Sequence, residues 1–522
     1  MTTASAHDAH CMKYSVPVNA PEEVAALVAA GADELYCGFQ DEWWTVRYGD
    51  HDSASRRQGA ANLITLDQLQ RTADAASAHG VPLYLALNTR YTEAQLDHLE
   101  GLCDSFQHMG GTGVIVSDLG LLWRLRTRTG LSRTLSLLAV AQNAPALRAF
   151  QDLGVTRVVF PRFINPAEAA SLLHAVPGMQ GEVMAFFDKC PLVDGYCRHR
   201  HGVSYPDRQD QLQDDGTAPL YTFDTTYRTH ACLGASCNYL EPYPCGACYL
   251  PSFQAAGVGF AKLGGRGRLL EERLRVLRFL KQAEACGGND ERSALYRQAF
   301  GQDCACYYGD AIQDRYAIEP IANAPCANEF SASSRRYLGS QTSFRAFRSD
   351  IETVCGDESE SVSLVHPKGC SSDHPTPTTV LVPPLSDEGL EWFLGMLPSV
   401  ASRLLCGTRL CVNDAGTLIE LIRMNRECDL GLQVSMGTLL ARLDDSAEVA
   451  RFQDPSQNPS RPVWGPNGEP RILTYAAPPK PLVDHWHHPS AMEPSAQAAL
   501  RSLTCETTIP YEFVMKRDSP FS

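Results

Sequence analysis

The fold class of this chain is decided by the stretch Tyr14-Ser-Val-Pro-Val-Asn-Ala-Pro-Glu-Glu-Val-Ala-Ala-Leu-Val-Ala-Ala-Gly-Ala-Asp-Glu-Leu-Tyr-Cys-Gly38. It begins with an apolar run at residues 14–18 and ends with another at 34–38, and both runs predict strands. Between them, residues 21–31 have an early proline, an acidic first turn and a terminal glycine, which together predict a helix. A helix between two apolar runs is typical of a βαβ unit, so the stretch predicts a parallel sheet.

The same alternation continues to residue 280 or so. The predicted strands are residues 14–18, 34–38, 82–88, 113–118, 133–140, 157–162, 181–187 and 259–265. The predicted helices are residues 21–31, 65–80, 92–110, 144–154, 165–176 and 269–285. Eight strands with intervening helices predict an α/β protein with a TIM-like (β/α)8 barrel, whose active site lies at the carboxyl ends of the strands. A doubly wound sheet is the alternative.

Polar residues close several of the predicted strands and are candidates for that site. They are Asn88, Asp118 and Arg162, together with the segment that Cys190 opens. Because the carboxyl ends of barrel strands meet at one face, we expect these side chains to converge there. The alternative for each of them is a helix cap or an ordinary loop position.

Six cysteines crowd into a long insertion after the seventh predicted strand. They are Cys190, Cys197, Cys232, Cys237, Cys245 and Cys248. Thiolates are soft ligands that favour zinc, copper(I) and iron-sulfur clusters, and a connection of this length is usually functional or disordered. The cysteine density therefore predicts a bound metal or iron-sulfur centre in the insertion.

Composition places the chain in a broad class. Its 522 residues allow two or three domains, and no stretch approaches the ~20 apolar residues that a membrane span needs. The N-terminus lacks the pattern of a signal peptide, so the 19 cysteines indicate a cytoplasmic protein with reduced thiols rather than a secreted disulfide scaffold. A net charge of -15 argues against a protein that coats nucleic acid, because phosphate binding rests on a basic face.

Four regions are predicted along the chain. They are a TIM-like barrel with the iron-sulfur site at residues 12–290, an irregular linker at 291–375, a second, smaller α/β region at 376–452 and a proline-rich C-terminal segment at 453–522. The second region echoes the first, since residues 412–421 match residues 116–125 at five of ten positions. Each decapeptide has the pattern of a strand entering a helix, which indicates a partial internal repeat.

Cys190 and Cys197 frame a glycine turn, Cys190-x4-Gly195-x-Cys197. Together with Glu182 and weaker motifs at residues 31–38, 116–120, 153–162 and 257–266, this signature resembles the collagenase-like peptidases of family U32. Several members of that family are understood as oxygen-independent hydroxylases. The resemblance extends over residues 14–280, a little more than half of the chain.

The resemblance implies a cofactor and a reaction. In the hydroxylase members four cysteines bind a [4Fe-4S] cluster, and by position these correspond to Cys190, Cys197, Cys232 and Cys245. The implied reaction is hydroxylation of an organic substrate, with prephenate as oxygen donor and the cluster as redox partner. The two carboxylates of the donor need cations. The expected substrate-binding residues are Arg162, Arg47, Asn88 and Arg266.

Two carboxylates, Glu182 and Asp118, are expected to act as acid and base groups at strand ends, with structural pairing as the alternative. The sequence also departs from the family pattern. Residues 182–190 lack the usual histidine and glycine before the first cysteine, and a usual glutamate is absent at 264–266, which indicates an atypical substrate.

Three other interpretations stay open. The last four cysteines of the insertion have a spacing that a four-thiolate zinc site can use. A peptidase is the second, although the sequence contains neither a Gly-x-Ser-x-Gly elbow nor a His-Glu-x-x-His helix. A non-catalytic partner protein is the third. The negative net charge of the chain favours a small-molecule or carrier-bound substrate over RNA. The second region is a possible surface for a protein partner.

Overall fold

The structure is a computed structural model that covers the chain in several parts. It describes residues 12–48, 54–57, 61–162, 164–187, 243–303, 308, 379–382, 385–404, 409–412, 414–428, 433–436, 463–464, 470–471, 495, 498–499 and 502–503. Of the four predicted cluster ligands, Cys245 lies within these residues. Cys190, Cys197 and Cys232 lie outside them.

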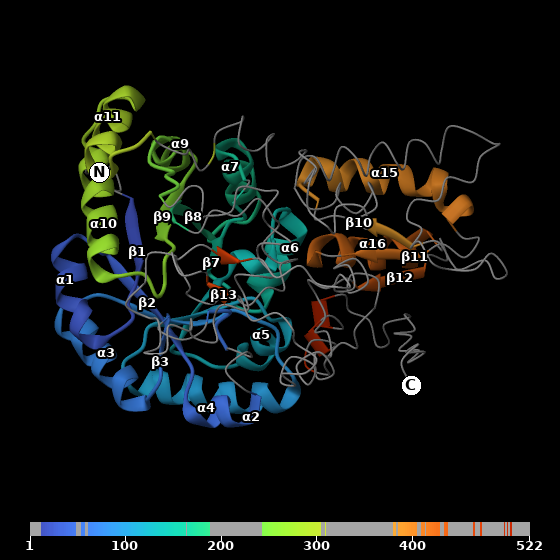
Figure 1. The fold of residues 1–522 in the computed structure, drawn as a ribbon. Coiled ribbons are helices and arrows are strands. Elements are labelled where there is room, and N and C mark those ends of the chain that lie inside the picture. The colour runs from blue at the N-terminus through green and yellow to red at the C-terminus, as the bar shows by residue number, and fades with distance from the viewer. Residues whose placement is uncertain are drawn as a thin grey trace, which may run out of the picture.

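Parallel strands form a closed barrel at the centre of the first region (Figure 1). They are β1 (Lys13–Pro17), β2 (Glu34–Phe39), β4 (Leu83–Leu87), β5 (Gly113–Val116), β6 (Ser132–Leu135), β7 (Arg157–Val159), β8 (Gln180–Phe186) and β9 (Val258–Leu263). β1 pairs with β2 on one side and with β9 on the other, which closes the barrel. A short strand, β3 (Asn62–Leu63), pairs with the end of β2. The predicted (β/α)8 barrel is confirmed, and the doubly wound alternative is excluded.

Helices cover the outside of the barrel (Figure 1). They are η1 (Pro21–Glu23), α1 (Val24–Ala29), α2 (Glu42–Tyr48), α3 (Leu66–Ala78), α4 (Glu93–His108), α5 (Leu119–Leu125), α6 (Ala144–Asp152), α7 (Pro166–Ala175), α9 (Leu250–Ala255), α10 (Leu270–Glu284) and α11 (Asn289–Phe300). Thr92 and Asn165 begin α4 and α7 with capping boxes, which satisfy backbone N–H groups at the helix start. None of the helices in the described part of the chain has both the length and the apolar character that a membrane crossing requires.

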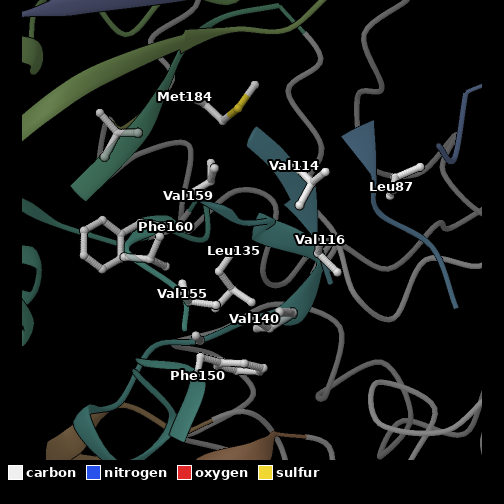
Figure 2. Close-up of a cluster of buried hydrophobic side chains, with 14 of the residues drawn as sticks. Leu87, Val114, Val116, Leu135, Val140, Phe150, Val155, Val159, Phe160 and Met184 are labelled. Atoms are coloured by element: carbon white, nitrogen blue, oxygen red, sulfur yellow. The ribbon is translucent and has the colours of Figure 1, made fainter. Parts of the chain in front are cut away.

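Apolar side chains fill the space between the strands and the helices. Figure 2 shows Val114, Leu135 and Val159 of three neighbouring strands in one cluster with Phe150 of α6. Burial of a side chain of this size contributes about 1.5–3 kcal/mol to folding. This packed layer fixes the strands, and therefore fixes the residues that follow their carboxyl ends.

The predicted boundaries differ from the structure most clearly in two places. The fifth predicted strand, β6 in the structure, ends at Leu135 instead of continuing to residue 140, because the side chain of Ser136 caps a short 3-10 helix, η3 (Leu137–Ala139). The barrel region also extends beyond residue 290. Helix α11 crosses that position, and the Phe300 ring packs 5.3 Å from the Phe186 ring of β8. The predicted linker therefore begins after Phe300.

The predicted second α/β region is confirmed. Its parallel strands β10 (Thr379–Val382), β11 (Arg409–Val412) and β12 (Gln433–Met436) are joined by α15 (Asp387–Leu404) and α16 (Ala415–Cys428). Helix α16 packs on α6 of the barrel (Figure 1). Asn143 at the start of α6 donates from Nδ2 to the Leu385 carbonyl at 2.8 Å and to Asp414 Oδ1 at 2.9 Å. Strands β13 (Val463–Trp464) and β14 (Pro470–Arg471) form a separate antiparallel pair.

The two echoing decapeptides form equivalent strand-to-helix turns. Asp118 follows β5, and its Oδ1 accepts the backbone N–H of Leu121 at 2.8 Å. Asp414 follows β11, and its Oδ1 accepts the backbone N–H of Thr417 at 2.8 Å. Each aspartate thus caps the helix that follows it. The local pattern is structural in both regions, and a wider duplication stays a prediction.

Candidate active site at the carboxyl face of the barrel

Polar side chains from several strand ends occupy the carboxyl face of the barrel. They are Asn88 after β4, Ser117 and Asp118 after β5, Ser136 after β6, Arg162 after β7 and Arg266 after β9. Asn88 Nδ2 donates to Ser136 Oγ at 3.4 Å, which connects the loops after β4 and β6. The structure therefore brings Asn88 and Asp118 to one corner of this face, while their roles stay predictions.

Arg266 holds a neighbouring segment in place. Its Nη2 donates to the carbonyl of Ser55, and Ser55 Oγ donates to Asn62 Oδ1 at 2.6 Å. A Cβ on Gly38 would overlap both Asn62 Oδ1 and Arg266 Nη1, so the glycine at the end of β2 makes room for the guanidinium. Because Arg266 is only 5% exposed, we interpret it as the residue that positions segment 54–57 at the face.

Arg90, which the sequence did not single out, lies in the loop after β4. Its Nη1 donates to Ser117 Oγ at 3.0 Å and its Nη2 to the Leu138 carbonyl at 3.5 Å. Burial lowers the pKa of Arg90, and the nearby carboxylate of Asp118 offsets part of this effect. Arg90 comes two residues after Asn88, so a search for cations just beyond each predicted strand would have found it.

Arg56 lies near Arg90, although the two residues are distant in sequence. The Tyr91 hydroxyl donates to the Ala54 carbonyl at 2.6 Å and thereby ties segment 54–57 to the loop after β4. After burial and the interactions that oppose it, the charge of Arg56 further lowers the pKa of Arg90. Arg56 has φ = 58°, a left-handed conformation that a residue other than glycine adopts at a cost.

Asp118 is a buried helix cap. Its Oδ1 accepts from Leu121 N, and its Oδ2 accepts from Tyr91 N at 3.4 Å. Burial raises the pKa of Asp118 despite these hydrogen bonds and the nearby Arg90. The structure thus gives Asp118 the capping role that was the alternative for this position, and an acid or base role stays a prediction.

Glu182 does not lie at a strand end. It is the third residue of β8, inside the barrel, where Glu182 Oε1 pairs with Lys262 Nζ at 3.0 Å and Oε2 with Arg157 Nη1 at 3.4 Å. Arg157 also pairs with Glu34 Oε1 at 2.6 Å and donates to the Tyr84 hydroxyl at 3.2 Å. The structure therefore places Glu182 inside the barrel, in the ion pairs that were the alternative for this residue, and an acid or base role stays a prediction.

The charges of this interior network determine the protonation of its two carboxylates. Burial acts to raise the pKa of Glu182, but Lys262 and Arg157 outweigh burial and lower it, so Glu182 stays ionised. Burial and the charge of Glu182 raise the pKa of Glu34. Removing one member of such a buried pair typically costs about 3–5 kcal/mol. We interpret Glu182 and Glu34 as carboxylates whose ion pairs with Arg157 and Lys262 stabilise the barrel interior.

Arg47 is exposed on helix α2, away from this group. Its guanidinium lies 4.2 Å from the centre of the Trp43 ring, and its Nη1 donates to the Trp43 carbonyl at 3.5 Å. The opposite neighbour of Trp43 is His98, whose ring stacks on it at 3.8 Å. These contacts form a surface stack, so the structure does not group Arg47 with Asn88 and Arg266.

The two ends of the cysteine-rich insertion meet beside the carboxyl end of β8. The backbone N–H of Phe187 donates to the Pro244 carbonyl at 3.2 Å, and that of Gly246 donates to the Ala185 carbonyl at 2.8 Å. Phe187 has φ = 61°, so the chain turns sharply as it leaves the strand. The insertion therefore starts and ends at the carboxyl face of the barrel.

Cys245 is the described member of the predicted ligand set. Its side chain is 2% exposed, and its Sγ accepts the backbone N–H of Ala247 at 3.4 Å. Cys248 is half-buried, and neither cysteine is in a disulfide. Within the part of the chain that the structure describes, no three His, Cys, Asp or Glu side chains form a metal-binding group.

A family model, Peptidase family U32, matches residues 19–300, which is more than half of the chain. The chain belongs to peptidase family U32. The resemblance inferred from the cysteine signature and the strand motifs is thereby confirmed, and the matched residues extend from the end of β1 to the end of α11.

Relatives in this family carry different names. A collagenase of Porphyromonas gingivalis is 25% identical over 201 residues, which cover 36% of this chain and 45% of the relative. The tRNA hydroxylation protein P of Escherichia coli is 26% identical over 192 residues, which cover 35% of this chain and 39% of the relative. A solved structure of a U32 peptidase covers 51% of this chain and 96% of its own, at 13% identity and a TM-score of 0.29. The chain thus matches less than half the length of these two curated relatives.

Proposed function

We propose that this U32 protein is an iron-sulfur enzyme that hydroxylates an organic substrate without molecular oxygen, with prephenate as oxygen donor. The observation that carries the proposal is that both described ends of the cysteine-rich insertion lie at the carboxyl face of the barrel, the face that also carries Asn88, Arg90 and Arg162. Barrel enzymes of this type perform their chemistry at that face. The relatives named tRNA hydroxylation protein P support a hydroxylation role.

The ligands proposed for a [4Fe-4S] cluster are Cys190, Cys197, Cys232 and Cys245. The surroundings of Cys245 suit that role, because its sulfur is buried and receives a backbone N–H, as cluster thiolates commonly do. When bound, the cluster would supply single electrons inside a closed site. Cys248 lies three residues further on, and its thiolate could replace one of these four as a cluster ligand.

The side chains around the cluster would bind and orient the substrates. Arg162 is half-buried at the end of β7 and can bind a carboxylate of the donor through forked hydrogen bonds. Arg266 would act indirectly, by fixing segment 54–57. Asn88 is at the same face and can contact substrate through its amide.

The proposed substrate is a small molecule or a carrier-bound intermediate rather than RNA, since the net charge of -15 opposes binding to phosphates. The proposed compartment is the cytoplasm, where Cys245 and Cys248 would stay reduced. The second α/β region, docked on α6, is the proposed surface for a protein partner.

The experiment that tests the cluster is purification under argon, followed by an absorption spectrum and by iron and sulfide analysis. The expected result is a brown protein with about four irons per chain, and loss of both colour and iron in Cys190→Ala and Cys245→Ala. Cys286→Ala is the matched control, because Cys286 lies at the end of α10 and should leave the iron content unchanged. A colourless protein that carries zinc, or no metal, would contradict the proposal.

A peptidase is the second candidate, favoured by the relative named collagenase. Two described cysteines make poor nucleophiles, because burial raises the pKa of Cys37 and of Cys103 to about 12. Hydrolysis of gelatin by the iron-free protein, with full activity in Cys190→Ala, would favour the peptidase over the iron-sulfur enzyme.

A further inference from the structure

We infer that Tyr296, Tyr308 and Arg268 form a clasp on the cysteine-rich insertion, which holds Cys245 against β8 and slows the loss of a bound metal. All three residues contact the segment 243–248, in which the insertion returns to the barrel, or the part of β8 beside it. The inference rests on the proposed function, because it concerns how metal is retained at the proposed cluster site. Tyr308 also lies outside the family match, which ends at residue 300.

The returning segment pairs with β8 over a short distance. Cys245 forms an antiparallel bridge with Phe186 of β8, and the backbone N–H of Gly246 donates to the Ala185 carbonyl at 2.8 Å. A pairing as short as this is marginally stable by itself. The side chains that pack on it therefore decide how firmly Cys245 is held.

Tyr308 supports this pairing. Its side chain is buried, and its hydroxyl donates to the Met184 carbonyl of β8 at 2.6 Å. The ring lies close to Gly246, where a Cβ would be 3.1 Å from Tyr308 Cε2 and 3.2 Å from the carbonyl oxygen of Ala185. The Phe253 ring of α9 packs on the same tyrosine, with the ring centres 4.9 Å apart. Tyr308 thus connects β8, the returning segment and α9.

Tyr296 of α11 holds the beginning of the returning segment. Its side chain is buried, and its hydroxyl donates to the Tyr243 carbonyl at 2.5 Å. Phe300, one turn further along α11, stacks on the Tyr243 ring with the ring centres 5.1 Å apart. Because Tyr243 precedes Cys245 by two residues, α11 fixes the place from which the chain approaches the cysteine.

Arg268 connects the two ends of the insertion. Its guanidinium lies 4.4 Å from the centre of the Phe187 ring, where the chain leaves β8, and 6.0 Å from the centre of the Tyr243 ring. Arg268 Nη1 donates to Glu272 Oε1 at 3.1 Å, and the Tyr243 hydroxyl donates to the same oxygen at 3.3 Å.

The clasp acts through backbone carbonyls, aromatic rings and one ion pair. None of the contacts described above uses a thiol, so they can form before a metal binds. Loss of a bound metal requires the ligand segment to open, and contacts that oppose this local opening slow the loss. Tyr296, Tyr308 and Arg268 are therefore positioning residues that act through Cys245.

The test is alkylation of Cys245 by iodoacetamide in the full-length protein, under argon, after a chelator has removed bound metal. Cys245 is 2% exposed, so the reagent reaches its sulfur when the segment opens. Tyr308→Phe and Tyr296→Phe each remove one hydrogen bond and keep the ring, and each should accelerate the alkylation about 2–12-fold. Tyr308→Ala also loses the ring packing and should accelerate it at least about 30-fold. Peptide mass spectrometry measures the rates.

Two kinds of control separate the clasp from general stability. Cys37 and Cys103 are buried elsewhere in the barrel, so their alkylation should stay at the wild-type rate in Tyr308→Phe. Tyr91→Phe is the matched variant, because Tyr91 is also buried and its hydroxyl donates to a backbone carbonyl at 2.6 Å, in the loop after β4. It should leave the alkylation of Cys245 unchanged. A wild-type rate at Cys245 in Tyr308→Phe, or an equal rise at Cys37, would overturn the inference.

Iron release gives a second readout. In protein purified with iron under argon, transfer of iron to a chelator should be about 2–12-fold faster in Tyr308→Phe than in the wild type or in Tyr91→Phe. Equal rates would overturn the metal-retaining role. A wild type without metal would refute the proposed function and this role together, whereas the alkylation rates would still show whether the clasp holds Cys245.

Discussion

The turns that begin α5 and α16 have the same local geometry in different surroundings. In each, an aspartate accepts the N–H of the residue three positions later at 2.8 Å. Asp118 then lies beside Arg90 at the carboxyl face of the barrel, whereas Asp414 lies against Asn143 at the start of α6. The short sequence pattern therefore determines the turn, and the neighbours determine what its carboxylate does.

The glycine of each turn shows the same contrast. A Cβ on Gly120 would lie 3.1 Å from a methyl carbon of Leu96 and 3.3 Å from the Cβ of Ser495, both of which are side-chain atoms. A Cβ on Gly416 would overlap Asn143 Oδ1 and lie 2.6 Å from the backbone nitrogen of Ala146. The second region thus approaches the backbone of the barrel, and its interface is packed like a protein interior.

Among variants that test the two turns, the largest loss of stability is expected for Asn143→Ala, which removes the contacts of the Asp414 turn. This change removes the cap of α6 and leaves the Leu385 carbonyl and Asp414 without their amide donor, which should lower the free energy of unfolding by about 2–4 kcal/mol. Urea unfolding measures the loss. Asn165→Ala is the matched control, since Asn165 caps α7 alone and should cost about 1 kcal/mol. Equal losses in the two variants would contradict the interface described here.

Gly416→Ala should have the next largest effect. The added methyl group meets backbone, which cannot move aside easily, so we expect a loss of about 1–3 kcal/mol and faster proteolysis of the second region. Gly120→Ala tests the other turn and should change stability by less than about 1 kcal/mol, because flexible side chains can yield. Equal losses of stability in the two variants would contradict the closer packing around Gly416.

Ser495→Ala probes the contact made beside Gly120. Ser495 Oγ lies 3.0 Å from Glu93 Oε2 and accepts from Arg124 Nε at 2.9 Å, in a half-buried position. We expect a loss of about 0.5–1 kcal/mol in thermal denaturation, as for an ordinary hydrogen bond. A loss above about 2 kcal/mol would mean that this contact is as tightly packed as the one at Gly416.

The smallest effect concerns the charge of Asp414. Burial raises its pKa, so the stability that this group contributes is complete below its unfolded pKa of about 3.9 and is lost as the pH rises through the folded value. Asp414→Asn keeps the cap in a neutral form. Relative to wild type, it should gain stability between pH 4 and pH 7, as measured by urea unfolding across that range. Asp118→Asn should gain less, because Arg90 already offsets part of the burial cost. Parallel pH profiles for wild type and Asp414→Asn would refute this assignment.

Much of the barrel could be predicted from local sequence. Its strands are apolar runs and its helices start at capping residues such as Thr92 and Asn165, signals that depend only on near neighbours. Helix α11 was missed because its main support is an aromatic cluster with Phe186 and Phe279, which exists only after the barrel has folded.

The candidate site was predictable where it consists of residues that directly follow strands, as Asn88, Asp118 and Arg162 do. Arg56 could not be found in this way, since it is brought to the face by the hydrogen bond between Tyr91 and Ala54. The predicted strand placed Glu182 near its start, as the structure does. Its ion-pair partners, Lys262 and Arg157, could not be predicted because they come from other strands. Contacts between distant strands remain beyond pattern-based inference.

The pairing of β1 with β9 has a consequence for how the chain is made. Lys13 is paired with Phe260, which the ribosome adds about 250 residues later. At ordinary rates of synthesis, β1 waits roughly 12–50 seconds for this partner. During that interval one edge of β1 has no strand partner, and every residue of the cysteine-rich insertion is translated before β1 and β9 can pair. Closure of the ring therefore has to wait for β9, and until then the open edge of β1 can pair with another chain.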